Sequence, residues 1–113
     1  MEIIYKICPA GQWREAEEEG VFSGAPVDLE DGFIHFSTGT QVKETAAKHF
    51  AAGNDLLLIA IDAGALGSGL RYEPSRRGEL FPHLYGKMPL TAVLWVKPLP
   101  LDSAGAHIFP EPL

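Results

Sequence analysis

A continuous apolar run from Leu56 to Ile61 constrains the fold of this chain more than any other segment. The run has the length of a strand, and strand side chains alternate between two faces. Because both faces are apolar, we expect this strand to be covered on both sides. Ile3 to Ile7 and Thr91 to Val96 are rich in β-branched and aromatic residues, and both are predicted to be strands.

Two helices are predicted, both in the first half of the chain. The first follows Pro9, which is well placed to begin a helix, and ends at Gly20. The second runs from about Gln41 to Ala52. The segment from Val21 to Asp31 is predicted to be a loop, because it is punctuated by glycine and proline. Strands mixed irregularly with so few helices indicate an α+β fold.

The composition is typical of a single globular domain over residues 1–113, with 46% hydrophobic and 21% charged residues. The net charge of -6 argues against a nucleic-acid partner, since binding to phosphates needs clustered cations. The four histidines lack metal-ligand spacing, so we expect no metal site. Cys8 is predicted to be a small buried thiol, although a reactive thiolate at a helix start is the alternative.

The chain shows neither a window long enough to span a membrane nor the features of a secretory signal at its N-terminus. We therefore expect a cytoplasmic protein without a membrane partner.

The segment Gly32-Phe33-Ile34-His35-Phe36-Ser37-Thr38 places an imidazole in an otherwise apolar run. In a strand from 33 to 37, His35 and Ser37 would share one face. Thr38 would then cap the second helix through a Thr-x-x-Gln box with Gln41. The free N–H groups at the N-terminus of that helix attract anions. The segment therefore predicts a ligand site. The alternative, slightly favoured by this segment alone, is a buried histidine bonded to a backbone carbonyl.

A second polar group begins at the predicted short strand from Leu70 to Glu73. Alternation places Arg71 and Glu73 on one face, either as a surface ion pair or at a cleft where they meet a ligand. Arg76 and Arg77 follow on a loop, where mobile side chains often contact ligands.

The segment from Phe81 to Gly86 is aromatic and polar, and it is interrupted by Pro82. It is predicted not to form a regular strand. His83 and Tyr85 could stack on a planar ring or hydrogen-bond to it. A packed loop in which these two side chains satisfy backbone groups is an equal alternative.

These motifs together resemble the domain of unknown function 952 family. The resemblance covers Ile3 to about Val96 and rests on Gly32 to Thr38, Gln41-Val42, Arg71-Tyr72-Glu73 and Phe81 to Gly86. The family comprises small, mostly bacterial proteins and is similar in fold to the ADP-ribosyltransferases. The resemblance implies an ADP-ribosylation-like α+β fold, with two small, mainly antiparallel sheets around a cleft that holds NAD.

His35-Phe36-Ser37 is similar to the His-x-Ser/Thr triplet with which the histidine-type ADP-ribosyltransferases grip NAD. The resemblance implies that His35 bonds the adenine-side ribose, that Ser37 supports the nicotinamide end and that Tyr85 stacks on nicotinamide. Phe36 departs from the pattern, because glycine at that position lets nicotinamide approach the backbone closely. Glu73 is the candidate catalytic carboxylate, and Glu79 is the second choice.

Two functions from different classes follow from these observations. The first is NAD-dependent ADP-ribosyl transfer or NAD cleavage, with His35 and Glu73 as catalytic residues. Its cofactor would be bound by polar and aromatic side chains, namely His35, Ser37, Thr38, Arg71, His83 and Tyr85. The second is a non-catalytic module that binds another small molecule or a peptide on the same scaffold. A hydrolase using Ser37 is a weaker third, because Ser37 lacks the flanking glycines of a nucleophile turn.

Overall fold

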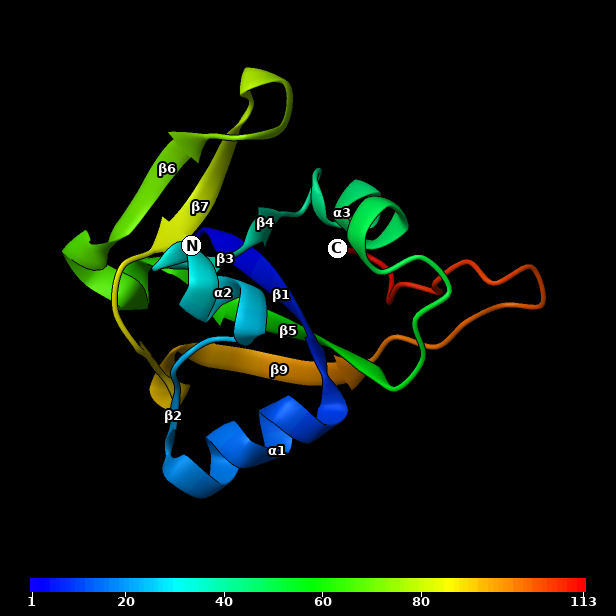
Figure 1. The fold of residues 1–113 in the computed structure, drawn as a ribbon, viewed down its shortest axis with the longest axis horizontal. Coiled ribbons are helices and arrows are strands. Elements are labelled where there is room, and N and C mark those ends of the chain that lie inside the picture. The colour runs from blue at the N-terminus through cyan, green and yellow to red at the C-terminus, as the bar shows by residue number, and fades with distance from the viewer.

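The computed structural model describes residues 1–113 as a mixed α+β fold with three antiparallel sheets (Figure 1). The largest sheet has the strand order β4-β1-β5-β9. Its strands are β1 (Ile3–Pro9), β4 (Ser37–Thr38), β5 (Leu56–Asp62) and β9 (Val93–Pro98). The apolar run forms the inner strand β5, nearly all of which is buried, as predicted. The last strand begins at Val93, slightly later than predicted, after a 3-10 turn η3 (Leu90–Ala92).

Helices cover both faces of this sheet, which explains why β5 is apolar on both sides (Figure 1). Helix α1 (Ala10–Glu19) packs Trp13 against the face that contains Ile4 and Cys8. Helix α3 (Val42–His49) packs Ala46 against the opposite face, which contains Tyr5. Helix α1 follows Pro9 and ends at Gly20, whose φ of 82° suits a residue without a side chain, as predicted. Helix α3 begins and ends inside its predicted range.

A three-stranded sheet of order β3-β7-β6 stands beside the larger one (Figure 1). Its strands are β3 (Ile34–His35), β7 (Leu80–Leu84) and β6 (Leu70–Pro74). A two-stranded sheet pairs β2 (Val21–Phe22) with β8 (Met88–Pro89), so the chain has one sheet more than the resemblance implies. The 3-10 segments η1 (Ala63–Gly69) and η2 (Arg76–Gly78) flank β6. No helix is long and apolar enough to cross a membrane.

The prediction of a loop from Val21 to Asp31 is wrong, because this segment contains β2 and a third α-helix, α2 (Pro26–Asp31). Pro26 occupies the first turn of that helix, where the missing N–H has no consequence. The carboxylate of Asp28 accepts a hydrogen bond from the N–H of Ala25 at 2.7 Å and closes the N-terminus. The glycine and proline that suggested a loop here mark the entry to a short helix.

The prediction that Phe81 to Gly86 is irregular is wrong for most of that segment, because β7 is the inner strand of its sheet. Proline is normally excluded from inner strands, since it has no N–H to donate. Here Pro82 lies opposite Tyr72, at a pair that the alternation of the β6–β7 ladder leaves without hydrogen bonds. On its other side, Pro82 accepts a hydrogen bond from the N–H of Phe36 at 3.0 Å.

The single strand predicted from 33 to 37 is divided between two sheets. β3 pairs with β7, β4 pairs with β1, and Phe36 lies between them. The predicted capping box is half formed. The amide oxygen of Gln41 accepts a hydrogen bond from the N–H of Thr38 at 3.0 Å, but the Thr38 hydroxyl contacts Thr40 instead. Helix α3 begins at Val42, one residue after the predicted start at Gln41.

Candidate functional site

A cavity of about 500 Å³ lies where the two larger sheets meet. Strand β4 pairs only with Ile4 and Tyr5 of β1. The cavity begins where this pairing ends, and β1 residues from Tyr5 to Ile7 line it. The other walls come from α2, β3, β4, α3, β7 and η2 with the loop before it. His35, Ser37 and His83 all line this cavity, so the structure brings together three of the predicted site residues.

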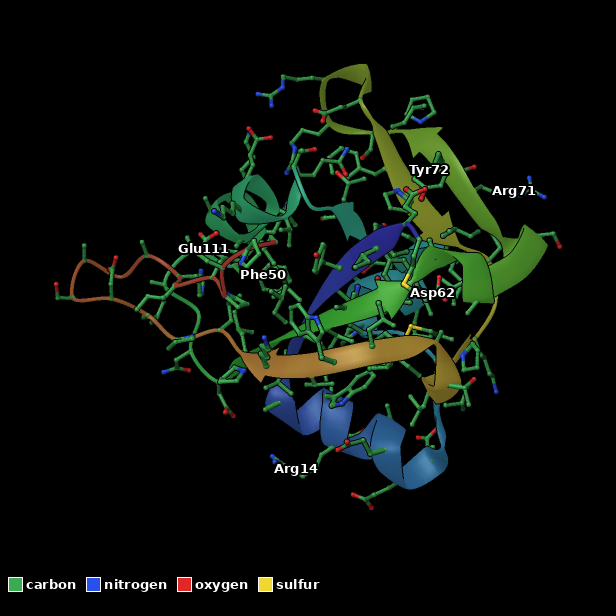
Figure 2. The ribbon with its side chains drawn as sticks, turned by 180° about the vertical axis from the view of Figure 1, so that it is seen from behind. Arg14, Phe50, Asp62, Arg71, Tyr72 and Glu111 are labelled. Atoms are coloured by element: carbon green, nitrogen blue, oxygen red, sulfur yellow. The ribbon has the colours of Figure 1, made fainter.

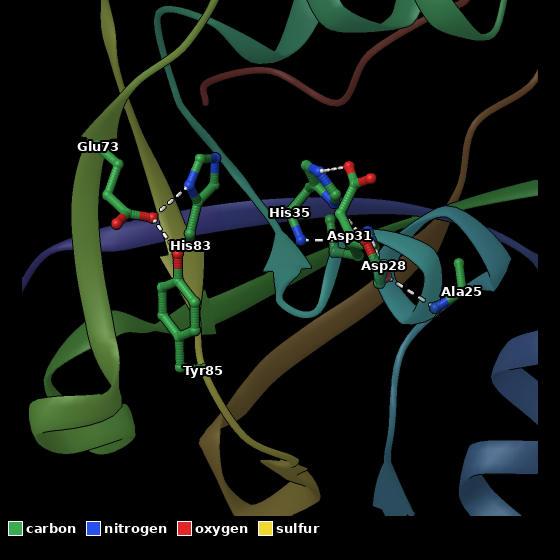
Figure 3. A network of polar contacts seen from close by, with 8 residues as sticks. Ala25, Asp28, Asp31, His35, Glu73, His83 and Tyr85 are labelled. Atoms are coloured by element: carbon green, nitrogen blue, oxygen red, sulfur yellow. Dashed lines mark hydrogen bonds and ion pairs between the residues drawn. The ribbon is translucent and has the colours of Figure 1, made fainter.

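Asp28 is the centre of a buried polar network that holds His35 in place (Figure 3). Its carboxylate lies 2.7 Å from Nδ1 of His35 and also accepts the N–H of His35 at 3.1 Å. The ammonium group of Lys6 lies 2.9 Å from the same carboxylate. Burial by itself would raise the pKa of Asp28, but the hydrogen bond from His35 and the charge of Lys6 lower that pKa to about 2. Burial lowers the pKa of Lys6, against the opposing effect of Asp28.

The second ring nitrogen of His35 also faces a carboxylate. Nε2 of His35 lies 2.9 Å from Asp31 at the end of α2. The Asp28 and Asp31 carboxylates therefore hold the His35 ring from both of its nitrogens.

His83 is held by a separate carboxylate, that of Glu73 (Figure 3). Nδ1 of His83 lies 2.8 Å from Oε1 of Glu73, and the hydroxyl of Tyr85 donates to the same oxygen at 2.7 Å. The bonds from His83 and Tyr85 lower the pKa of Glu73, and the bond to Glu73 raises the pKa of Tyr85. Nε2 of His83 makes no hydrogen bond within the chain, although His83 lines the cavity.

His35 and His83 lie directly opposite each other on β3 and β7. Their ring centroids are 5.5 Å apart in an edge-on arrangement. The Phe33 ring packs against both, at 4.6 Å from His35 and 4.2 Å from His83. This cross-strand aromatic contact fixes the orientation of both imidazoles.

A row of hydroxyl and guanidinium groups forms another part of the cavity wall. The hydroxyl oxygens of Ser37 and Thr45 are 3.0 Å apart. Nη2 of Arg76 donates to the Thr45 hydroxyl at 3.2 Å. Ser37, Thr45 and Arg76 come from β4, α3 and η2, so three separate elements meet here.

The remaining predicted site residues lie away from the cavity wall. Glu73 contacts His83 from outside the lining, and Tyr85 contacts Glu73. Arg71 points outward from β6, with its guanidinium 5.5 Å from the centroid of the Tyr85 ring (Figure 2). Thr38 bonds Gln41 through its N–H, and Glu79 accepts from the Gln41 amide at 3.2 Å. Arg71 and Glu73 share one strand face, as their contacts with the same side chain, that of Tyr85, indicate.

Cys8 is fully buried in the core, and burial raises the pKa of its thiol to about 11. This position fits the predicted packing role of a small thiol rather than a reactive thiolate. No group of three or more His, Cys, Asp or Glu side chains is arranged to hold a metal ion.

Sequence reasoning missed Asp28, Lys6, Asp31 and Thr45, which surround the predicted residues. Lys6 carried a usable signal, since a lysine inside an apolar strand needs a buried anion. Asp28 carried a weaker one, because an acid shortly after Pro26 is typical of the first turn of a helix. Asp31 and Thr45 join the site only through the tertiary fold.

One family model and solved structures of one bacterial protein match this chain. The family model described as "Protein of unknown function (DUF952)" matches residues 7–96. No curated protein matches the chain. The crystal structure of protein CC0527 from Caulobacter crescentus is 44% identical, covers 94% of this chain and 93% of that chain, and gives a TM-score of 0.90. The solution NMR structure of the same protein is 45% identical, covers 94% and 91% respectively, and gives a TM-score of 0.84.

Proposed function

The chain belongs to the DUF952 family of proteins of unknown function, and on that premise we propose that it binds a small nucleotide-like ligand in the cavity beside His35. One observation carries the proposal: His35, Ser37, His83 and Arg76 converge on one cavity of about 500 Å³. This volume falls in the range of small-molecule sites, which combine an apolar lining with a few placed polar groups.

The lining matches the parts of a nucleotide. Phe36, Phe50 and Phe81 offer aromatic surface for a planar ring. His83 Nε2 can bond a sugar hydroxyl. NAD and ADP-ribose have these parts. We also propose that the fold is ADP-ribosylation-like, because the cavity lies between two antiparallel sheets.

Binding without turnover is the form of the function that we favour. Glu73, the candidate catalytic carboxylate, bonds His83 and Tyr85 and does not line the cavity. Asp31 is the carboxylate that lines the cavity, and it faces Nε2 of His35. Neither carboxylate is free to stabilise positive charge that develops on a ligand.

NAD cleavage is the second candidate, on the observation that His83 Nε2 is unbonded while Nδ1 is held by Glu73. This is the arrangement of a general base. Water would attack C1′ of the nicotinamide ribose, nicotinamide would leave with the electrons of its glycosidic bond, and Nε2 would take the proton of the water. Release of nicotinamide from NAD by the wild type, lost in His83→Gln and retained in His107→Gln, would establish it.

A thermal-shift titration with NAD, ADP-ribose and nicotinamide tests the binding proposal, because a ligand of the folded state raises the melting temperature. We expect NAD or ADP-ribose to stabilise the wild type, and expect His35→Ala and Ser37→Ala to weaken that effect. His107→Ala is the matched control, since His107 bonds the carbonyl of Gly53 outside the cavity. The proposal fails if no nucleotide shifts the melting temperature at millimolar concentration, or if His107→Ala has the same effect as His35→Ala.

A further inference from the structure

We propose that Arg76, together with the hydroxyls of Thr45 and Ser37, forms a subsite for a phosphate group. The inference rests on the proposed function and specifies it, because it names the charge of the ligand and the end of the cavity at which that charge lies.

Arg76 is an unusually buried cation with unused hydrogen-bond donors. Its side chain is only 15% exposed and lines the cavity. A guanidinium has five N–H donors, yet only one hydrogen bond leaves Arg76, from Nη2 to Thr45 at 3.2 Å. Nε is buried without a hydrogen-bond partner. A guanidinium with several unoccupied donors in a cavity wall is suited to bind an anion from solution.

Glu44, the acidic side chain paired with Arg76, makes its hydrogen bonds to Arg77 instead. Both oxygens of Glu44 bond Nη2 of Arg77, at 2.8 and 2.9 Å. The approach of Glu44 to Nε of Arg76 is longer, at 3.4 Å, and does not make a hydrogen bond. Glu44 thus forms an ion pair with both arginines, but it hydrogen-bonds only to Arg77, and Arg76 keeps most of its donors unoccupied.

The guanidinium of Arg76 is also held in position before any ligand arrives. It lies over the Phe81 ring, at 4.9 Å from the ring centroid, and its Nη2 is fixed by Thr45. An arginine stacked on an aromatic ring loses less freedom on binding, because its plane is already set.

The paired hydroxyls add a donor from a second direction. Ser37 and Thr45 carry two hydroxyl protons, and the 3.0 Å contact between their oxygens uses one of them. The bond from Arg76 uses neither hydroxyl proton, because Arg76 is the donor and the Thr45 oxygen is the acceptor. One O–H therefore remains to donate to a ligand. A tetrahedral phosphate can accept from this hydroxyl and from the guanidinium at the same time.

Binding of inorganic pyrophosphate, ADP-ribose and adenosine, measured by calorimetry at constant ionic strength, tests the subsite. Arg76→Gln is compared with Arg77→Gln, which removes the same charge from the next residue, outside the cavity lining. We expect Arg76→Gln to weaken pyrophosphate and ADP-ribose binding about tenfold or more, as for loss of a charge-assisted bond. Adenosine, which has no phosphate, should be unaffected, and Arg77→Gln should stay within about twofold of the wild type.

Thr45→Val provides a second variant that keeps the shape and removes the hydroxyl, so that a folding defect in Arg76→Gln does not decide the result. We expect a smaller loss of pyrophosphate affinity in Thr45→Val than in Arg76→Gln. ADP-ribose binding that is unchanged in Arg76→Gln would overturn the subsite and leave the proposed function standing. Pyrophosphate binding that depends on Arg76, without any binding of ADP-ribose, would support the phosphate subsite but overturn the proposal that the ligand is a nucleotide. No binding of either anion would overturn both.

Discussion

The two histidines that face each other across β3 and β7 are held by carboxylates in opposite ways. The Nδ1–carboxylate distances are nearly equal, at 2.7 Å for His35 and 2.8 Å for His83. Asp28 is 1% exposed and its histidine 33%, whereas Glu73 is 32% exposed and its histidine 7%. One pair therefore buries its carboxylate and the other buries its imidazole.

This difference gives the two carboxylates different roles: Asp28 stabilises the fold, and Glu73 orients its histidine. A buried carboxylate must have all its charge compensated, and Asp28 has Lys6, His35 and a backbone N–H around it. A partly exposed carboxylate contributes little to stability, but Glu73 can still select which nitrogen of His83 carries a proton. Equal distances thus do not imply equal roles.

The largest expected effect comes from Asp28→Asn. This change leaves Lys6 buried without an anion, so we expect the free energy of unfolding to fall by about 3–5 kcal/mol. Glu73→Gln, the matched change in the other pair, should lower it by much less, because Glu73 is partly exposed to solvent. Urea denaturation of the three proteins measures both values. Similar losses in the two variants would show that the pairs are equivalent.

A smaller effect is expected for the coupling between Lys6 and Asp28. In a double-mutant cycle of Lys6→Met and Asp28→Asn, the double variant should be more stable than the sum of single losses predicts, by about 1–3 kcal/mol. The reason is that either single change leaves one buried charge and the double change leaves neither. The same cycle on Lys43 and Glu111, an exposed pair at 3.3 Å, should give a coupling of less than about 1 kcal/mol. Strict additivity for Lys6 and Asp28 would contradict the buried ion pair.

Acid should remove the stability that the buried Asp28 carboxylate provides. The pKa of Asp28 is about 2 in the folded protein, below the value of about 4 expected in the unfolded chain. The folded state then binds fewer protons, so the stability from Asp28 is complete above about pH 5 and is lost as the pH falls towards 2. The free energy of unfolding, measured in urea at several pH values, should fall more steeply for the wild type than for Asp28→Asn. Parallel curves would mean that Asp28 has no lowered pKa.

The smallest effect is a change of tautomer without a change of fold. Glu73 accepts from Nδ1 of His83, so neutral His83 should carry its proton on Nδ1 and leave Nε2 free. Nitrogen-15 NMR of the ring distinguishes the two nitrogens. In Glu73→Ala we expect both tautomers to be populated. A proton on Nε2 in the wild type would show that Glu73 does not orient this histidine.

The parts of the fold that follow from local chemistry were predictable. The apolar run of β5 and the Pro9 and Gly20 boundaries of α1 are signals that neighbouring residues produce by themselves. The sequence was misleading where a residue depends on distant partners. Pro82 fits an inner strand because its pair with Tyr72 needs no hydrogen bond from it and because β3, its other neighbour, ends at His35.

The candidate site was predictable as a set of residues but not as a geometry. Alternation placed His35 and Ser37 on one face, and both do line the cavity. The contact of His35 with His83 depends on the register of β3 against β7, which no local pattern specifies. Asp28 was missed because its carboxylate closes its own short helix and also reaches a histidine on another strand. The identity of the ligand stays a prediction.

Phe36, the one residue between β3 and β4, has a mechanical consequence. His35 lies on the three-stranded sheet and Ser37 on the four-stranded sheet, although only Phe36 separates them in the chain. A ligand that contacts both side chains spans the seam between the sheets and opposes their separation. Amide hydrogen exchange should then slow in both sheets upon binding, and not only at the residues that touch the ligand.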